Sequence, residues 1–141
     1  MSGDVFGIEP AIPGTPGPTG PAGPPGTPYE TVTSDTAASA GNVARRKTNG
    51  HVEKATGGTQ ADSLGVVALY SAAVLLGAST DIYKPGSRLP VAGLPVGDLY
   101  RSNTGTAVLY ASLVVGEWTN GLGYSDGNGL DVNISEGFEV T

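Results

Sequence analysis

The chain of 141 residues contains no cysteine and a single histidine, His51. Without cysteine it has no disulfide framework, no thiolate nucleophile and no thiolate metal site. One histidine excludes any site that needs two imidazoles from the same chain. Basic residues are also few, 7 against 13 acidic ones, for a formal net charge of −6. Because duplex DNA and anionic membranes favour clustered Lys and Arg, we expect neither nucleic acid nor membrane as a partner.

Long apolar runs are missing as well. The amino end is acidic and lacks the basic start and apolar core that are typical of a secretion signal. The longest apolar-rich stretch, residues 64–76, is shorter than a bilayer-spanning helix and is interrupted by Gly65 and Ser71. The sequence therefore predicts neither a secretion signal nor a transmembrane segment.

Glycine and proline, in contrast, are abundant and unevenly placed. Eight of the 11 prolines precede Tyr29. Between residues 14 and 28, glycine occupies every third position without a break, at Gly14, Gly17, Gly20, Gly23 and Gly26. Proline favours the polyproline II path of three residues per turn, and only glycine fits at the axis when three such strands wind together. This segment predicts a collagen-like homotrimer with those five glycines as the trimerisation residues.

A stiff monomeric linker is the alternative for residues 14–28, but it would not need regular glycine spacing. Five triplets rise about 45 Å, which is short for a self-sufficient triple helix, so we expect the neighbouring domain to help hold three chains together. Residues 1–13 form a separate N-terminal arm. This arm is either a frayed terminus or an anchor that packs its few apolar side chains on a neighbour.

Residues 29–141 are predicted to be an all-β domain, a small barrel or sandwich of short strands. Short β-prone runs alternate with turn signals such as Asn49-Gly50 and Asp126-Gly127-Asn128-Gly129. The cleanest half-buried strand is at Leu130, Val132 and Ile134, which alternate with polar residues. A short helical turn is expected near residues 72–76. The predicted strands are 30–34, 42–48, 51–55, 64–70, 82–83, 88–92, 98–101, 107–113, 121–124 and 130–134.

The run Asn42 to Ala55 is predicted to form a hairpin, with Asn49 and Gly50 at the centre of a type I′ turn. Its first strand carries the only basic cluster of the sequence, Arg45-Arg46-Lys47. Strand alternation places at most two of these charges on one face. The cluster is either solvated protection of an edge strand or an ion-pairing patch for an acidic partner.

Few residues suggest catalysis. His51 lies beside a turn with Glu53 on the same face, but no nucleophile motif accompanies them. Residues 126–137 fail the calcium-loop pattern, because its fifth, sixth and twelfth positions are not the required ligands or glycine. Asp98 and Glu117 are expected to act as solvated caps. We therefore predict no catalytic, cofactor-binding or metal-binding residues and no enzyme activity; a site assembled between chains is a weaker option.

A series of motifs runs in order along the β domain. These are Asn49-Gly50-His51-Val52-Glu53-Lys54-Ala55, Leu64-Gly65-Val66-Val67, Leu94-Pro95-Val96-Gly97-Asp98-Leu99-Tyr100-Arg101, Thr104-Gly105, Trp118-Thr119-Asn120-Gly121-Leu122-Gly123-Tyr124 and Leu130-Asp131-Val132-Asn133-Ile134. In this order they resemble the small β-barrel modules of tailed bacteriophages that serve as capsid decoration, or cement, proteins. The resemblance covers residues 29–134.

The resemblance implies a non-enzymatic homotrimeric virion protein, assembled in the bacterial host cytoplasm. It would bind the exterior of the icosahedral capsid and stabilise contacts between subunits of the major capsid protein. Apolar surface at Leu75, Leu76, Val91 and Leu94 would supply part of this binding. The collagen-like segment departs from the commonest family pattern, and whether it touches the shell or projects outward stays open.

A second class of function fits the same sequence. The chain would then be a tail-fibre piece or surface adhesin whose collagen-like stalk presents the β domain to a receptor or glycan. An exposed Trp118 near a cleft would favour this interpretation, because an indole ring offers a flat apolar face with a polar edge.

Overall fold

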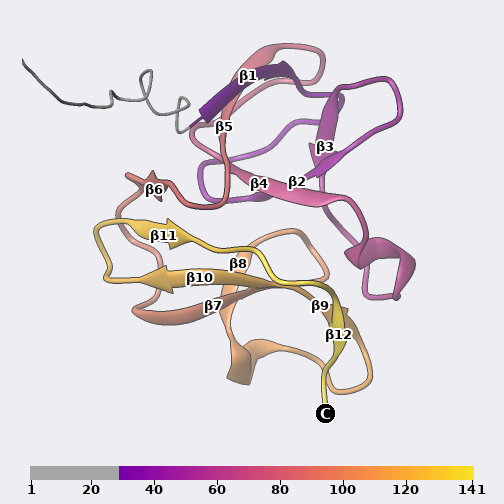
Figure 1. The fold of residues 1–141 in the computed structure, drawn as a ribbon, viewed down its shortest axis with the longest axis vertical. Coiled ribbons are helices and arrows are strands. Elements are labelled where there is room, and N and C mark those ends of the chain that lie inside the picture. Colours follow the sequence, from indigo (N-terminus) through magenta and orange to yellow (C-terminus); the bar gives the residue numbers. More distant parts are fainter. Residues whose placement is uncertain (1–28) are drawn as a thin grey trace, which may run out of the picture.

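The structure is a computed structural model, and it describes residues 29–141 (Figure 1). Within that range the chain is all β, as predicted, with two short 3-10 turns, η3 (Ala61–Ser63) and η4 (Tyr110–Ser112). The predicted arm, the collagen-like segment and its five glycines lie outside the described residues. The strands are β1 (Tyr29–Thr33), β2 (Val43–Arg46), β3 (Val52–Lys54), β4 (Val66–Tyr70), β5 (Ser79–Tyr83), β6 (Arg88–Leu89), β7 (Gly97–Arg101), β8 (Ala107–Leu109), β9 (Trp118–Thr119), β10 (Gly121–Ser125), β11 (Leu130–Val132) and β12 (Phe138–Glu139).

The first sheet has the order β1-β5-β4-β2-β3 and is antiparallel throughout. Its two edges meet. Just after β1, Ser34 forms a parallel bridge with Val52 of β3, and the Asp35 amide donates to the Val52 carbonyl at 2.8 Å. The sheet therefore curls until it closes, which leaves little edge for pairing with another chain.

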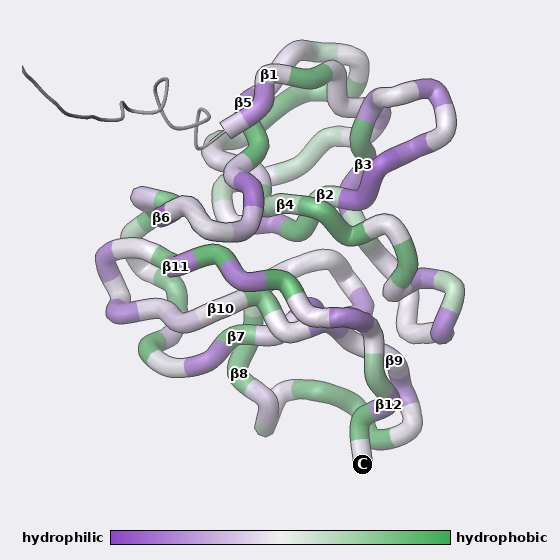
Figure 2. The backbone as a smooth tube through the Cα atoms, in the orientation of Figure 1, coloured by the Kyte–Doolittle hydropathy of each residue, from purple (hydrophilic) through white to green (hydrophobic). Residues whose placement is uncertain are grey.

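The second sheet has the order β6-β11-β10-β7-β8, and a small ladder pairs β12 with β9. Figure 1 shows this sheet below the first one, with the carboxyl end at the foot of the molecule. Figure 2 shows hydrophobic and hydrophilic residues alternating along β11, which is the pattern that the sequence predicted there. Leu130 and Val132 are buried and Asp131 is exposed.

Alternate residues of the first sheet point to opposite faces and pack into two separate hydrophobic clusters. Val43 and Leu69 face the second sheet and pack in a cluster with Leu99 and Leu122. Their neighbours Ala44, Ala68 and Tyr70 point the other way, into a second cluster inside the closed first sheet. Because both faces of the first sheet are buried, β4 is apolar along its whole length rather than alternating.

All ten predicted strands overlap an observed one, but several details differ. The two-residue strands β9 and β12 were not predicted. The run 107–113 is a strand only to Leu109 and then turns into η4. The helical turn expected near residues 72–76 is wrong. Val74 pairs its backbone with Ala38 instead, which holds the segment in an irregular loop.

The β2–β3 hairpin is confirmed, although its turn is not the predicted one. The Gly50 amide donates to the Lys47 carbonyl at 3.0 Å, and the Lys47 amide donates to the His51 carbonyl at 2.9 Å. The loop therefore has three residues, and Gly50 takes the left-handed conformation with φ of 88°. Three-residue hairpin loops of this kind place glycine last, so the glycine is still required, at a different position of the turn.

Gly123 marks an irregularity in the centre of the second sheet. The pairing of β10 with β7 shifts register between Gly121 and Gly123, and Gly123 has φ of 128°. A Cβ atom there would overlap the carbonyl of Asp131 on β11. Only glycine therefore lets β10 approach β11 this closely beside the bulge.

Candidate functional site

The most exposed apolar feature of the described residues is the loop between β4 and β5, residues 72–77. Leu75 is 78% exposed and Leu76 is 73% exposed, and Ala72 and Ala73 beside them are exposed as well. In Figure 1 this loop forms the top of the molecule. A run of exposed apolar residues without a polar interruption is atypical of a free surface.

The 72–77 loop is held firmly by its backbone. Val74 is buried, and its amide and carbonyl both bond to Ala38, at 3.0 and 3.1 Å. The Gly77 amide donates to the Ser34 carbonyl at 2.7 Å. The two leucines are therefore presented on a fixed frame, because the residue before them and the residue after them are both bonded to the segment that follows β1.

A second exposed apolar surface lies at the opposite end of the long axis, around η4 (Figure 1). It comprises Leu109, Tyr110, Val114 and Val115, the last of which is 73% exposed. Tyr110 packs edge-on against Tyr100 with 5.3 Å between ring centroids, which fixes its orientation. The molecule therefore carries apolar surface at both ends.

Two of the four residues predicted to form a contact surface are placed differently. Val91 and Leu94 are partly buried and pack against the core between the sheets. They lie between Pro90 and Pro95 in the connection after β6, and this connection folds back onto the core. Leu75 and Leu76 alone fulfil the expectation of exposed apolar surface.

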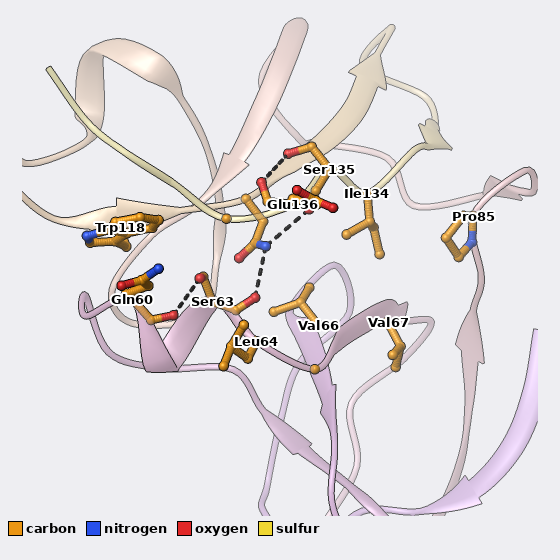
Figure 3. A pocket seen from close by; sticks show the side chains of 13 residues that line it. Gln60, Ser63, Leu64, Val66, Val67, Pro85, Trp118, Ile134, Ser135 and Glu136 are labelled. Carbon is orange, nitrogen blue, oxygen red and sulfur yellow. Dashed lines mark hydrogen bonds between the residues drawn. The ribbon is translucent and has the colours of Figure 1, made fainter.

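A groove of about 770 Å³ opens between the two halves of the described chain (Figure 3). One wall comes from η3 and β4, and the other comes from β9 and the segment after β11. Trp118 and Gln60 lie close together at one end, and Pro85 lies at the other end. The lining residues are Gln60, Ser63, Leu64, Gly65, Val66, Val67, Pro85, Trp118, Asn120, Ile134, Ser135, Glu136 and Gly137.

Buried hydrogen bonds form the floor of this groove. The Asn120 side chain, 2% exposed, donates to the carbonyls of Ser63 and Ser135, at 3.1 and 3.2 Å. The Ser63 hydroxyl donates to the Gln60 carbonyl at 2.6 Å. The two walls are therefore tied together beneath the opening, so the groove is preformed.

Behind Asn120 lies Arg101, a buried cation that the sequence did not single out. It is 1% exposed. Its guanidinium donates to the Asn120 side-chain oxygen at 2.9 Å, the Gly57 carbonyl at 2.7 Å and the Trp118 carbonyl at 3.1 Å. No carboxylate among the described residues forms an ion pair with it. Burial, together with repulsion from Arg45, lowers the pKa of this guanidinium.

The basic cluster of β2 is neutralised within the chain. β2 lies between β3 and β4, so the interpretation as edge-strand protection is wrong. The cations are paired as follows: Arg45 with Glu53 at 3.2 Å, Arg46 with Glu30 at 2.7 Å and Lys47 with Asp35 at 2.8 Å. Since each positive charge already has an internal carboxylate, the cluster offers little to an acidic partner.

His51 lies in the same polar group as Lys47. Its Nδ1 is 2.9 Å from an Asp35 oxygen, and the Asn49 amide donates to the other Asp35 oxygen at 3.1 Å. Bonds from Lys47, Asn49 and His51 hold the pKa of Asp35 well below its usual range. The carboxylate that orients His51 is thus Asp35, not Glu53. This group braces the hairpin against the segment that follows β1.

The remaining polar candidates form no catalytic or metal-binding group among the described residues. Asp126 accepts the amides of Asn128 and Gly129 and closes the β10–β11 turn, as predicted. Asp98 lies in β7 rather than in a turn, which corrects its interpretation as a cap. Among the described residues no group of three or more metal-ligating side chains comes together.

Comparison with known proteins adds no family. No protein-family model matches the chain, and no curated protein is significantly similar to it. In the part of the chain that the structure describes, no helix is long and apolar enough to cross a membrane.

Proposed function

We propose that the protein is a homotrimeric capsid decoration protein. It binds the exterior of an icosahedral bacteriophage shell and stabilises contacts between subunits of the major capsid protein, without enzymatic activity. Its single most important support is the 72–77 loop, where Leu75 and Leu76 are exposed on a fixed frame. The motif order along residues 29–134 supplies the choice of partner.

The size of the loop suits a weak contact that is repeated many times. Full burial of a leucine side chain contributes about 1.5–3 kcal/mol, so one loop alone binds weakly. Three loops on one trimer act together, because the second and third contacts are intramolecular once the first has formed. A second capsid subunit would contact the apolar surface around η4, at the other end of the long axis.

The collagen-like repeat supports a threefold arrangement. Glycines at every third position from Gly14 to Gly26 are needed only if three chains meet around one axis. A closed threefold oligomer matches the local threefold positions of an icosahedral shell. The trimer and the shell contact therefore depend on separate parts of the sequence.

Binding to shells that lack the protein tests the contact. The double variant L75S/L76S should lose most binding, at least about 100-fold in affinity, because three loops are weakened together. Y124S is the matched control, since Tyr124 is exposed on β10 and lies outside the loop. Wild-type protein should saturate at hundreds of copies per shell. Equal binding of L75S/L76S and wild type would refute the role of the loop.

Sedimentation of the free protein tests the trimer. We expect about three times the 14.1 kDa of one chain at micromolar concentration. Gly20→Val should weaken this association and leave the β domain folded, because the two depend on different interactions. A wild-type protein that sediments as a monomer would overturn the trimer and leave the shell contact to be judged on its own.

A further inference from the structure

The groove beside Trp118 has apolar and polar lining residues that take no part in the proposed shell contact. It shares no residue with the 72–77 loop or with the surface around η4. Its volume, about 770 Å³, falls within the range of small-ligand sites. Its floor is preformed by the buried Asn120 side chain, so little ordering is needed when a ligand enters.

The lining combines an apolar wall with two uncommitted polar side chains. Leu64, Val66 and Ile134 provide apolar surface along the groove between Trp118 and Pro85 (Figure 3). The Gln60 amide and the Glu136 carboxylate lie at the rim. Neither of these two side chains makes a hydrogen bond or ion pair with any other described residue, so both can bind a ligand instead.

The charge of the lining residues indicates which class of ligand the groove can bind. Glu136 is the one charged residue in the described lining, and the lining contains no Lys or Arg. Anionic ligands such as nucleotides or sulfated sugars would meet a carboxylate without a compensating cation. An extended peptide could not add to β4 or β11, because both strands are hydrogen-bonded on both sides.

We infer that this groove is a binding site for a neutral saccharide. One sugar ring stacks its C–H face on the Trp118 indole, as expected for a flat apolar ring at a wet site. Its hydroxyl groups bond to the Gln60 amide and the Glu136 carboxylate. A trimer would present three such grooves, which raises the avidity for a polysaccharide that carries repeated units.

Trp118 is the only tryptophan of the chain, so its fluorescence reports on the groove directly. The full-length protein is titrated with maltoheptaose, laminarihexaose, chitotetraose and mannotetraose, each to about 10 mM, a range that detects millimolar affinities. We expect at least one of them to shift the emission saturably, with a matching heat of binding by calorimetry. The absence of both signals for all four probes would refute the site.

Substitutions of groove residues test whether the saccharide binds at this site. By calorimetry, Q60A and W118A should each weaken binding of the active probe by at least about 10-fold, and W118F should weaken it less because a ring is kept. Gln60 is exposed, so Q60A keeps the test decisive even if W118A does not fold. Y124A is the matched aromatic control outside the groove and should bind as wild type.

Two further outcomes decide between ligand classes. A sulfated form of the active probe should bind more weakly than the neutral form, and stronger binding of the sulfated form would overturn the proposal. L75S/L76S should retain full saccharide affinity although it loses the shell. Loss of both activities in that variant would show that the groove is not an independent site.

Discussion

Arg101 offers the sharpest test of how the β domain is held together. It is a buried cation whose guanidinium, among the described residues, bonds only to three uncharged oxygens, from Asn120, Gly57 and Trp118. In Arg101→Met the apolar stem is kept and the guanidinium is removed. All three oxygens then lose their donor inside the protein, in the region where the two sheets and the groove meet.

The magnitude follows from those three bonds. A buried acceptor left without a donor costs about 1–3 kcal/mol. Removing the guanidinium also removes the cost of burying its charge, which offsets part of the loss. We therefore expect R101M to lower the free energy of unfolding by about 3–5 kcal/mol, a large share of the 5–15 kcal/mol that is typical of a domain.

Urea denaturation measures this change. With a slope of about 2 kcal/mol per molar urea, the midpoint should fall by about 2 M at an unchanged slope. Far-UV circular dichroism is followed together with Trp118 fluorescence, because the Trp118 carbonyl is itself a partner of Arg101. Protein concentration is held fixed, since association in the native state adds to apparent stability.

Arg88→Met is the matched control. Arg88 also forms strong contacts, at 2.6 Å to Asp126 and 3.2 Å to Asp131, but its side chain is 46% exposed. Exposed ion pairs contribute little, so R88M should leave the midpoint nearly unchanged. If R101M moves the midpoint no further than R88M does, the three buried bonds do not stabilise the fold and the reasoning fails.

Three other predictions concern separate parts of the domain. Gly123→Ala should cost at least about 3 kcal/mol in thermal or urea unfolding, because the new methyl overlaps the Asp131 carbonyl on β11. Gly93→Ala is the control, at a φ of 91° in open space, and should cost only about 1–2 kcal/mol. Equal losses in the two variants would contradict the close approach of β10 and β11. Asp35→Asn should destabilise the protein at pH 7. Because the pKa of Asp35 is lowered in the folded protein, the stabilisation by its carboxylate is full above the usual carboxyl pKa of about 4 and is lost as the pH falls below that value. The free energies of unfolding of wild type and D35N should therefore converge in acid. A difference that stays constant with pH would exclude the charge as the cause. Tyr70→Phe should cost about 1 kcal/mol in chemical denaturation, since it removes the buried hydroxyl bond of 2.8 Å to Ser34, and an unchanged midpoint would show that this bond is replaced.

Local sequence patterns predicted most of the fold. The all-β class and the overlap of ten strands came from turn residues and alternation, both of which act over a few positions. The two-residue strands β9 and β12 are too short to show a period. The turn at Gly50 was placed one residue off, because Asn-Gly fits two loop lengths and the sequence does not distinguish them.

The candidate sites were less predictable, since their parts are distant in the sequence. The groove joins η3 to the segment after β11, and Trp118 was linked with a cleft only conditionally. In the sequence, Arg101 looks like an ordinary residue at the end of a strand. Its burial depends on Gly57 and Asn120, which are distant from it in the sequence. Leu75 and Leu76 were named as apolar contact surface together with Val91 and Leu94, and only the two leucines of the 72–77 loop are strongly exposed.

The ladder between β1 and β5 sets how the domain would respond to mechanical load. Its five pairs run from Tyr29↔Tyr83 at one end to Thr33↔Ser79 at the other, where the 72–77 loop joins β5. The cross-strand bonds lie perpendicular to the strands. A pull applied between Tyr29 and the 72–77 loop would therefore shear all five pairs at once instead of breaking them one at a time. Tension directed along that line would meet the most resistant direction of the sheet.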